Sequence, residues 1–512
     1  MDKITEKNAK QRRLIMNRKK LLALNTSSSL IFQLTTIVCG FIVPRLILKS
    51  YGSEVNGLIN SIMQFLAIIS FLELGVGAVI QSSLYKPLAE NDYNQISRVM
   101  VSGQKFFSRL ATILLVYVVI LMGIYPLIAK TNFGFLYTAI MILVISISSF
   151  AQYYFGIVNS LLITANQRGY FSYNIQTITL ILNTIACFIL IKLGASIHIV
   201  KLTTSLIYLA RPLILSLYVK KNYKINWNIK YDEEPIKQKW NGIAQHISAV
   251  VLDGTDNIVL TVFMGLEIVS VYSVYNMVVM GVKKLLMSMT NGIQSLMGEL
   301  LAREEIDRLR KFFGWVEWSI HTGTTFIFGV TAILIIPFVE VYTSGIHDAN
   351  YIQPLFAVLI VAANAGHCLR LPYNILILAG GHYKQTQNNY IIAAIINIVI
   401  SILFVNILGL AGVAIGTLLA MFYQTIWMAI YDSKNLIRWP IKYFIKQLLV
   451  DGITVLFFVI IAKFSTINEI TWISWILYSI KVSIISLVFM GIINAIFYKK
   501  YITVILKKLK RY

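Results

Sequence analysis

Charged residues are scarce in this 512-residue sequence, in which Asp, Glu, Lys and Arg together make up 13%. A soluble domain of average composition carries about 25%. Hydrophobic residues make up 57%, and a soluble core cannot take up that much apolar surface, whereas a lipid bilayer can. The composition therefore predicts an integral membrane protein.

Cysteine is also rare, and Cys39, Cys187 and Cys368 lie far apart in apolar runs. Their spacing fits neither a metal site nor a disulfide framework. The sequence has no GxxxxGK[ST] phosphate loop, no HExxH zinc motif and no GxSxG nucleophile elbow, which are signatures of ATP hydrolysis, metal catalysis and acyl transfer. We therefore expect no catalytic residue, no metal and no cofactor, and a protein that is not an enzyme.

Acidic residues are half as frequent as basic ones, with 22 Asp and Glu against 45 Lys and Arg, and the formal net charge is +23. In a soluble chain this balance would suggest a nucleic-acid partner. Here the basic residues lie mostly between apolar runs, where anionic membrane lipids explain them. The pattern predicts contact with membrane lipids and no nucleic-acid partner.

Apolar runs of about 20 residues, the length that crosses a bilayer, recur along the whole chain. They are too long and continuous for the alternating strands of a membrane barrel. The sequence predicts an all-α integral membrane fold with fourteen transmembrane helices, at 25–48, 57–84, 106–129, 135–163, 171–192, 197–219, 242–264, 269–298, 315–338, 353–379, 388–408, 411–431, 447–464 and 472–497.

The distribution of Lys and Arg predicts the orientation of these helices. With the N-terminus inside, 34 basic residues fall on the inner side and 6 on the outer side. Positive residues accumulate on the cytoplasmic side of membrane proteins, so both termini are predicted to be cytoplasmic. The first 24 residues are too long and too polar for a cleaved signal peptide. The outer loops are short, which leaves little room for an external catalytic domain.

The two halves of the sequence resemble each other at a shift of 213 or 214 residues. The matches are Ile80-Gln81-Ser82 with Ile293-Gln294-Ser295, Leu88-Ala89 with Leu301-Ala302, Gly52 and Glu54 with Gly265 and Glu267, and Ala165, Asn174 and Asn183 with Ala379, Asn388 and Asn397. Six spans separate equivalent positions, so the repeat is parallel, an arrangement typical of transporters.

The repeat predicts two six-helix bundles followed by two C-terminal helices. The expected parts are a basic tail (1–24), an N-terminal bundle (25–220), a cytoplasmic linker (221–241), a C-terminal bundle (242–432), the last two helices (433–498) and a second basic tail (499–512).

Several segments resemble the polysaccharide flippases of the multidrug/oligosaccharidyl-lipid/polysaccharide exporter superfamily. They are Arg45-Leu-Ile-Leu-Lys-Ser-Tyr-Gly52, Glu54-Val-Asn-Gly-Leu58, Glu73-Leu-Gly75, Leu84-Tyr-Lys-Pro-Leu-Ala89, Thr255-Asp-Asn257 and the segment from Gly380 to Asn389. The resemblance implies a bacterial cytoplasmic-membrane protein that flips undecaprenyl-pyrophosphate-linked oligosaccharide repeat units by alternating access. It also implies work alongside a polysaccharide polymerase and glycosyltransferases.

Ionisable residues inside the spans are costly and are therefore candidates for function. A cation on a cavity wall lowers the cost of removing a lipid pyrophosphate from water, and Arg suits phosphate by its bidentate geometry. The proposed head-group ligands are Arg45, Lys283, Lys284 and Arg370, with Asn276 and Gln294 on the same predicted helical stripe as Lys283.

Two carboxylates, Asp253 and Asp256, lie on one face of the span at 242–264. They are predicted to pair with the cations or to bind a coupling proton or sodium ion; a purely structural helix pairing is the alternative. Other readings also stay open: Arg45 can extend to the outer interface, and only one of the adjacent Lys283 and Lys284 can point into a cavity. Pro372, beside Arg370, should kink its helix.

Three other functions compete with polysaccharide-precursor flipping. One is a lipid II-type peptidoglycan precursor flippase, and another is a cation-coupled multidrug exporter of the same superfamily. The third, a glycan-processing membrane enzyme, is disfavoured by the short outer loops and by the repeat.

Overall fold

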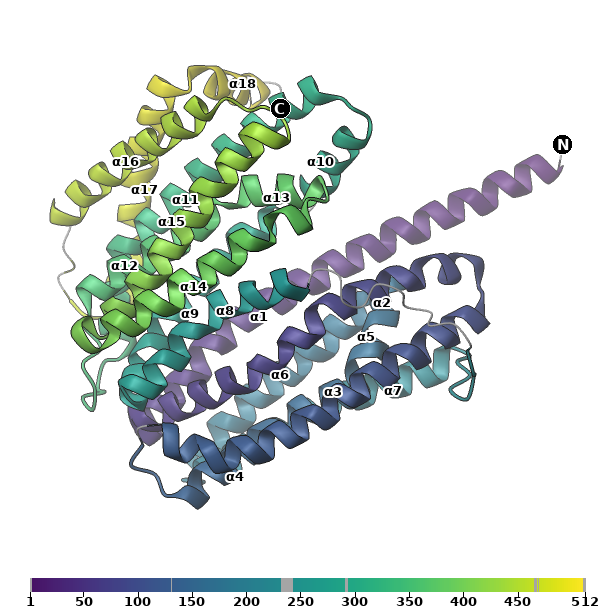
Figure 1. The fold of residues 1–512 in the computed structure, drawn as a ribbon, viewed down its shortest axis with the longest axis horizontal. Coiled ribbons are helices and arrows are strands. Elements are labelled where there is room, and N and C mark those ends of the chain that lie inside the picture. Colours follow the sequence, from purple (N-terminus) through teal and green to yellow (C-terminus); the bar gives the residue numbers. More distant parts are fainter. Residues whose placement is uncertain are drawn as a thin grey trace. The chain divides into compact units, whose positions relative to one another are not determined.

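The computed structural model describes residues 2–129, 131–231, 243–290, 293–464, 467 and 469–509. The described chain forms helices and the turns that join them (Figure 1). It divides into two compact units, Met1–Ile247 and Ser248–Tyr512. Each unit is a bundle of long helices, as the apolar runs predict.

The described part of unit 1 is built from long helical segments. Two of them are interrupted, one by the short 3₁₀-helix η1 and one by the π-helix η2. Its helices are α1 (Asp2–Ala67), η1 (Ile68–Ser70), α2 (Phe71–Glu90), α3 (Tyr93–Ile128), α4 (Phe135–Ala151), the π-helix η2 (Gln152–Gly156), α5 (Ile157–Ala165), α6 (Gly169–Lys192) and α7 (Ile197–Asn222). In this unit α1 packs against α6, and α7 packs against both α4 and α6. Since α1 begins at Asp2, the predicted basic tail continues the first helix.

Unit 2 contains most of α8 and all later helices. They are α8 (Ile243–Phe263), α9 (Leu266–Met289), α10 (Ile293–Ala302), α11 (Ile306–Tyr342), α12 (Pro354–Leu369), α13 (Leu371–Ala379), α14 (Tyr383–Leu408), α15 (Leu410–Asn435), α16 (Ile441–Phe464), α17 (Trp472–Phe497) and α18 (Lys499–Leu509). The helices α16 and α17, predicted to lie outside the repeat, pack against α11 and against each other.

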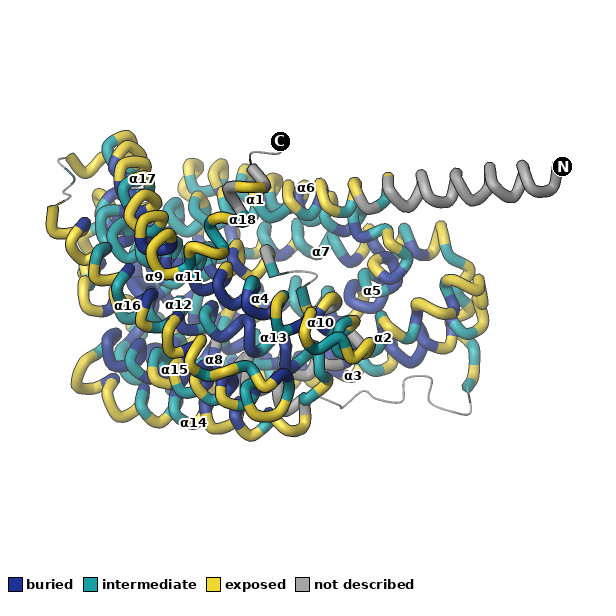
Figure 2. The backbone as a smooth tube through the Cα atoms, turned by 90° about the horizontal axis from the view of Figure 1, so that it is seen from above, coloured by how far each residue is buried: buried dark blue, intermediate teal, exposed yellow. Residues whose placement is uncertain are grey.

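Large apolar side chains cover the outward faces of the helices. Leu127, Ile407 and Ile473 are 83%, 74% and 73% exposed, and Figure 2 shows exposed residues along most helices of both units. Exposure of so many large apolar groups would be unfavourable in water but fits a lipid environment, in which the helical backbone satisfies its own hydrogen bonds. The protein is therefore a multi-pass membrane protein.

Twelve of the described helical segments are long and apolar enough to cross a membrane, whereas the sequence predicts fourteen spans. The segment from Ala23 to Ala67 contains a non-helical residue, Gly52, so it holds the first predicted span and the beginning of the second. The 21-residue α8 corresponds to the predicted span at 242–264 and is not among the twelve. The number fourteen stays a prediction.

The predicted repeat is visible in the backbone conformations of the two units. Gly52 has φ 85° and ψ 173°, and Gly265, at the predicted shift of 213, has φ 97° and ψ 172°. Further positive-φ residues recur at nearly the same shift: Asn91 (56°) with Glu304 (57°), Gln167 (57°) with Gly381 (71°), and Gly194 (73°) with Gly409 (57°). Because positive φ is unfavourable for most residues, its recurrence supports a duplicated chain path.

Each unit also contains a span that is interrupted partway along. In unit 1, the π-helix Gln152–Gly156 separates α4 from α5. In unit 2, α12 ends at Leu369 and α13 begins at Leu371, with Pro372 in its first turn. The kink predicted at Pro372 is confirmed, since proline cannot donate the backbone hydrogen bond that would continue α12.

Gly52 and Gly265 lead to a first prediction. Their backbone conformation is one that glycine adopts almost alone, so replacing either with alanine should destabilise the protein by about 1–3 kcal/mol. Thermal unfolding of the purified protein in detergent would measure the loss. Gly491→Ala is the matched control, because its added methyl group meets nothing within 4 Å in helix α17. Equal thermal stability of all three variants would contradict the prediction.

Candidate functional site

Two of the predicted head-group ligands, Arg370 and Lys283, lie buried in unit 2, with 6% and 4% of their surfaces exposed. Arg370 stands at the break between α12 and α13. It donates hydrogen bonds to Gln424 of α15 and, over 3.3 Å, to Nδ1 of His367. Its guanidinium also lies 5.8 Å from the ring centre of Tyr390. The helix break thus presents a guanidinium within the bundle.

Lys283 of α9 and Arg370 belong to the same buried group, the cation cluster. His367 interacts electrostatically with both of them, as does Cys368, and α9 packs against α12. The Nε of Arg370 is buried and has no hydrogen-bond partner among the described residues. The structure therefore brings together two cations that lie 87 positions apart in the sequence, and the group has capacity to bind an anion.

The other predicted head-group residues lie elsewhere. Arg45 is half-buried in unit 1, and Asn276 is half-buried on α9. Lys284, next to Lys283, is exposed, which agrees with the expectation that only one of the two lysines points inward. Gln294 is exposed on α10. The stripe predicted to join Asn276, Lys283 and Gln294 is wrong for Gln294, because α9 ends at Met289 before α10 begins.

The predicted ion-coupling residue Asp256 is buried on α8, where α8 meets α14 and α15 in unit 2. The Thr417 hydroxyl lies 2.9 and 2.7 Å from its two carboxylate oxygens, and Asn397 Nδ2 lies 3.3 Å from Oδ1. The hydroxyl of Tyr272 is 3.4 Å from Oδ2. The second predicted residue, Asp253, has a side chain outside the part that the structure describes.

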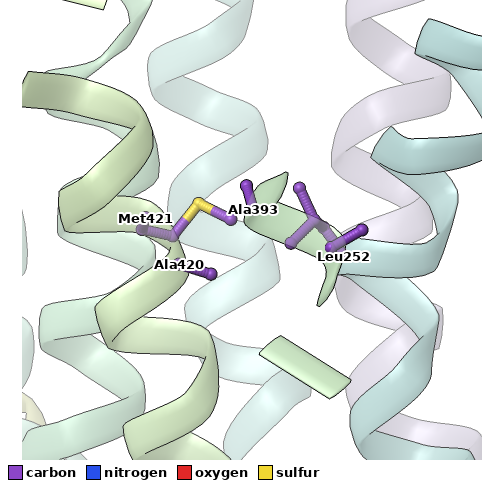
Figure 3. Packing of buried hydrophobic residues seen from close by; sticks show 5 residues of the cluster. Leu252, Ala393, Ala420 and Met421 are labelled. Atoms are coloured by element: carbon purple, nitrogen blue, oxygen red, sulfur yellow. The ribbon is translucent and has the colours of Figure 1, made fainter. Parts of the chain in front are cut away.

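An apolar cluster about one helical turn away holds the same three helices together. Leu252 of α8, Ala393 and Ala394 of α14, and Ala420 and Met421 of α15 are all buried in it. Figure 3 shows Leu252 facing Ala393 while Met421 approaches from the other side. The small alanine side chains let the helices approach closely, as in other membrane bundles, and this packing positions the Asp256 carboxylate.

The Asp256 site has the chemistry of a hard-cation site. Carboxylate, amide and hydroxyl oxygens are the ligands that such ions prefer, and Asn397 Oδ1 is buried with no hydrogen-bond partner among the described residues. That oxygen lies in the same group as the Asp256 carboxylate and the Thr417 hydroxyl. The oxygens of the three side chains can serve as ligands of a sodium ion, and the carboxylate alone can take a proton.

A second group of buried ionisable residues was not selected from the sequence. Glu317 and His321 of α11 and Asp451 of α16 are at most 8% exposed, and Tyr373 of α13 lies among them. All three ionisable residues fall inside predicted spans, which is the signal that could have singled them out. Their mutual contacts depend on helices more than 100 residues apart and are not visible in the sequence.

Unit 1 contains a polar cavity of about 290 Å³ around Arg211 of α7. The Arg211 guanidinium donates to Thr179 Oγ1 at 2.6 Å and lies 3.8 Å from the ring centre of Tyr208. All lining residues except Ile175 and Leu215 are polar; the others are Ser148, Ser149, Gln152, Tyr153, Ser160, Ser172, Gln176, Tyr208 and Arg211. Hydroxyl and amide groups at membrane depth, beside the π-helix η2, form a site suited to a polar or anionic ligand.

No family profile matches the sequence, and no curated protein matches it either. Solved structures do match. The lipid II flippase MurJ in its inward closed conformation aligns over 94% of this chain and 100% of its own, with a TM-score of 0.70 and 15% identity. A variant of the Vibrio cholerae MATE transporter VcmN aligns over 82% of this chain and 98% of its own, with a TM-score of 0.59 and 15% identity.

A MOP superfamily transporter from Pyrococcus furiosus aligns over 80% of this chain and 95% of its own, with a TM-score of 0.56 and 13% identity. At such low identities the likeness concerns the fold. The chain therefore has the fold seen in MOP-superfamily transporters.

The Asp256 site leads to a second prediction. If it binds Na⁺, a hundredfold excess of the ion over its dissociation constant should stabilise the protein by about 2.7 kcal/mol. Asp256→Asn and Thr417→Val should each abolish the sodium-dependent rise in Tm. Glu90→Gln, which removes a carboxylate exposed beside Lys86, should leave that rise unchanged; an undiminished rise in Asp256→Asn would rule the site out.

Proposed function

We propose that this protein translocates undecaprenyl-pyrophosphate-linked oligosaccharide repeat units across the bacterial cytoplasmic membrane, from the inner to the outer leaflet. The observation that carries the proposal is the extent of the structural likeness. The lipid II flippase aligns over its whole length and over 94% of this chain, whereas the Vibrio cholerae MATE transporter VcmN aligns over 98% of its own length and 82% of this chain. The proposed substrate shares with lipid II a lipid that carries a sugar.

The buried cations supply the electrostatics that such a substrate needs. A pyrophosphate cannot leave water for the membrane interior unless opposite charge replaces its hydration. Arg370 and Lys283 are buried in one cluster, and the guanidinium offers planar, bidentate binding to phosphate oxygens. The lipid tail can stay in the bilayer while the head group crosses, so the protein must shield only the polar part.

The polar cavity of unit 1 has side chains suited to binding a sugar. Its serine hydroxyls, glutamine amides and two tyrosines are side chains that exchange hydrogen bonds with sugar hydroxyls and pack against sugar rings. Alternating access of the two units would then expose the head-group sites to each side in turn. Cation binding at Asp256 is the proposed source of energy for this cycle.

A lipid II-type flippase is the second candidate, and the same likeness to MurJ supports it. The two candidates differ in their consequences for the cell. Loss of a peptidoglycan precursor flippase stops wall synthesis, whereas loss of a surface-polysaccharide flippase removes only that polysaccharide. A viable deletion strain that lacks one surface polysaccharide would support the proposal, and depletion that leads to lysis would favour lipid II. A drug-efflux assay tests the multidrug alternative.

The cation cluster leads to a third prediction. Replacing Arg370 or Lys283 with alanine should reduce surface polysaccharide at least about tenfold, because loss of a buried charge partner typically costs about 2–5 kcal/mol. Arg370→Lys should restore little, since a lysine lacks the bidentate geometry. Quantified surface polysaccharide, normalised to membrane-inserted protein, is the measurement.

Lys284→Ala is the matched control for this experiment, because it removes the same charge from the exposed neighbouring position. It should leave the polysaccharide unchanged. Normal output from Arg370→Ala, Lys283→Ala and the double variant would remove these residues from the proposed mechanism.

A further inference from the structure

Four buried side chains of unit 2 are joined end to end by hydrogen bonds. The Tyr373 hydroxyl lies 2.8 Å from Glu317 Oε1 and 3.2 Å from His321 Nε2. The other ring nitrogen of His321 lies 2.7 Å from Asp451 Oδ2. The four side chains, here called the relay, come from α11, α13 and α16 and are at most 8% exposed.

Hydrogen counting shows that the relay has a place for one additional proton. Each of its three contacts needs one hydrogen between the two heavy atoms. The tyrosine hydroxyl provides one and a neutral imidazole provides another, so with both carboxylates ionised one contact lacks a hydrogen. Adding one proton completes all three contacts, wherever that proton resides.

The added proton can rest on Glu317, on His321 or on Asp451 with all three contacts satisfied. With the proton on Glu317, the carboxyl donates to Tyr373, which donates to His321. When the glutamate O–H bond breaks, its hydrogen forms a new tyrosine O–H bond, and the former tyrosine hydrogen forms the N–H bond of an imidazolium. A proton therefore passes between the ends of the relay without movement of any heavy atom.

One end of the relay opens into a cavity of about 660 Å³, which Glu317 helps to line. The second carboxylate oxygen of Glu317 accepts a hydrogen bond from Trp439 Nε1 at 3.0 Å. Lys446, Lys499 and Arg310 also line the cavity, on the side of the membrane that the sequence predicts to be cytoplasmic. The cavity is large enough for many water molecules, at about 30 Å³ each, so protons have an aqueous route to Glu317.

The other end of the relay closes inside the helix bundle. Asp451 Oδ1 accepts a hydrogen bond from the Thr325 hydroxyl at 2.9 Å and lies 3.4 Å from Gln447 Nε2. Beyond Thr325 on the same helix, Val330 packs with Tyr478 and Val482 in an apolar cluster. In the part of the chain that the structure describes, the relay leads from the cavity to a buried acceptor, Asp451.

Ionisable side chains of several helices lie around the relay. On α15, Asp432 is 1% exposed, interacts electrostatically with Glu317, and has no hydrogen-bond partner for either carboxylate oxygen among the described residues. Because two carboxylates close together repel each other when both are ionised, Asp432 beside Glu317 favours the retention of a proton in this region. The other ionisable groups that line the cavity are Arg310 and Lys311 of α11, Tyr443 and Lys446 of α16, Tyr498, which follows α17, and Lys499, Lys500 and Tyr501 of α18.

We propose that Glu317, Tyr373, His321 and Asp451 form an internal proton-binding site that is loaded from this cavity. The inference goes beyond the proposed transport function, since proton binding needs no sugar substrate. The site joins α16, which lies outside the predicted repeat, to α11 and α13. Its occupancy therefore changes the charge at the contact between the C-terminal helices and the repeated bundle.

Infrared titration of the full-length purified protein tests the proposal. A buried protonated carboxyl gives a C=O band that shifts in D₂O. Wild-type protein should show this band, or the ring bands of an imidazolium if the proton rests on His321, at neutral pH and lose them in alkali. Both Glu317→Gln and Asp451→Asn should diminish them. Tyr373→Phe interrupts the relay between the two acids, so the single titration step should become two.

Two controls separate the relay from other carboxyl groups. Glu299→Gln removes an exposed acid paired with Arg303 at 2.7 Å, and Asp432→Asn removes a buried acid outside the relay. Neither should abolish the band. A carboxyl band that disappears only in Asp432→Asn would overturn the proposal. So would a wild-type protein with neither a carboxyl band nor imidazolium ring bands at neutral pH, a result that does not depend on any variant folding. Both outcomes leave the flipping proposal untouched.

Discussion

The membrane interior offers little water, so a polar group at that depth is costly unless it finds a partner within the protein. This constraint explains how unit 2 is organised. Its buried charges do not lie singly on the spans but gather in three groups, around Arg370, Asp256 and Glu317. Each group draws residues from at least two helices, so the same contacts that satisfy the charges also fix the packing of the bundle.

The duplicated chain path shows which of these groups belong to the basic fold. Positive-φ residues and an interrupted span recur in both units at the predicted shift. The cation cluster lies at the interrupted span of unit 2, and the polar cavity of unit 1 lies beside its interrupted span. The relay instead depends on α16, a helix outside the repeat. The relay therefore links a helix outside the repeat to α11 and α13 within it.

Much of the fold was predictable because apolar runs and basic loops report directly on membrane spans. The break before Pro372 was predictable from the chemistry of proline, and Lys283 and Arg370 from the cost of burying charge. The break between Met289 and Ile293 carries no proline, so Gln294 was wrongly placed on the stripe of Lys283. The relay escaped prediction because a sequence shows ionisable residues but not which of them meet: His321 and Asp451 lie 130 positions apart.

The central claim is that this chain carries a lipid-linked sugar across a bilayer. Purified protein reconstituted into liposomes with a fluorescent undecaprenyl-pyrophosphate oligosaccharide tests it most directly, with a membrane-impermeant quencher reporting the leaflet. The account predicts that the protein speeds the movement of head groups between leaflets and that Arg370→Ala abolishes the acceleration. Movement no faster than in protein-free liposomes, under every ion gradient applied, would contradict it.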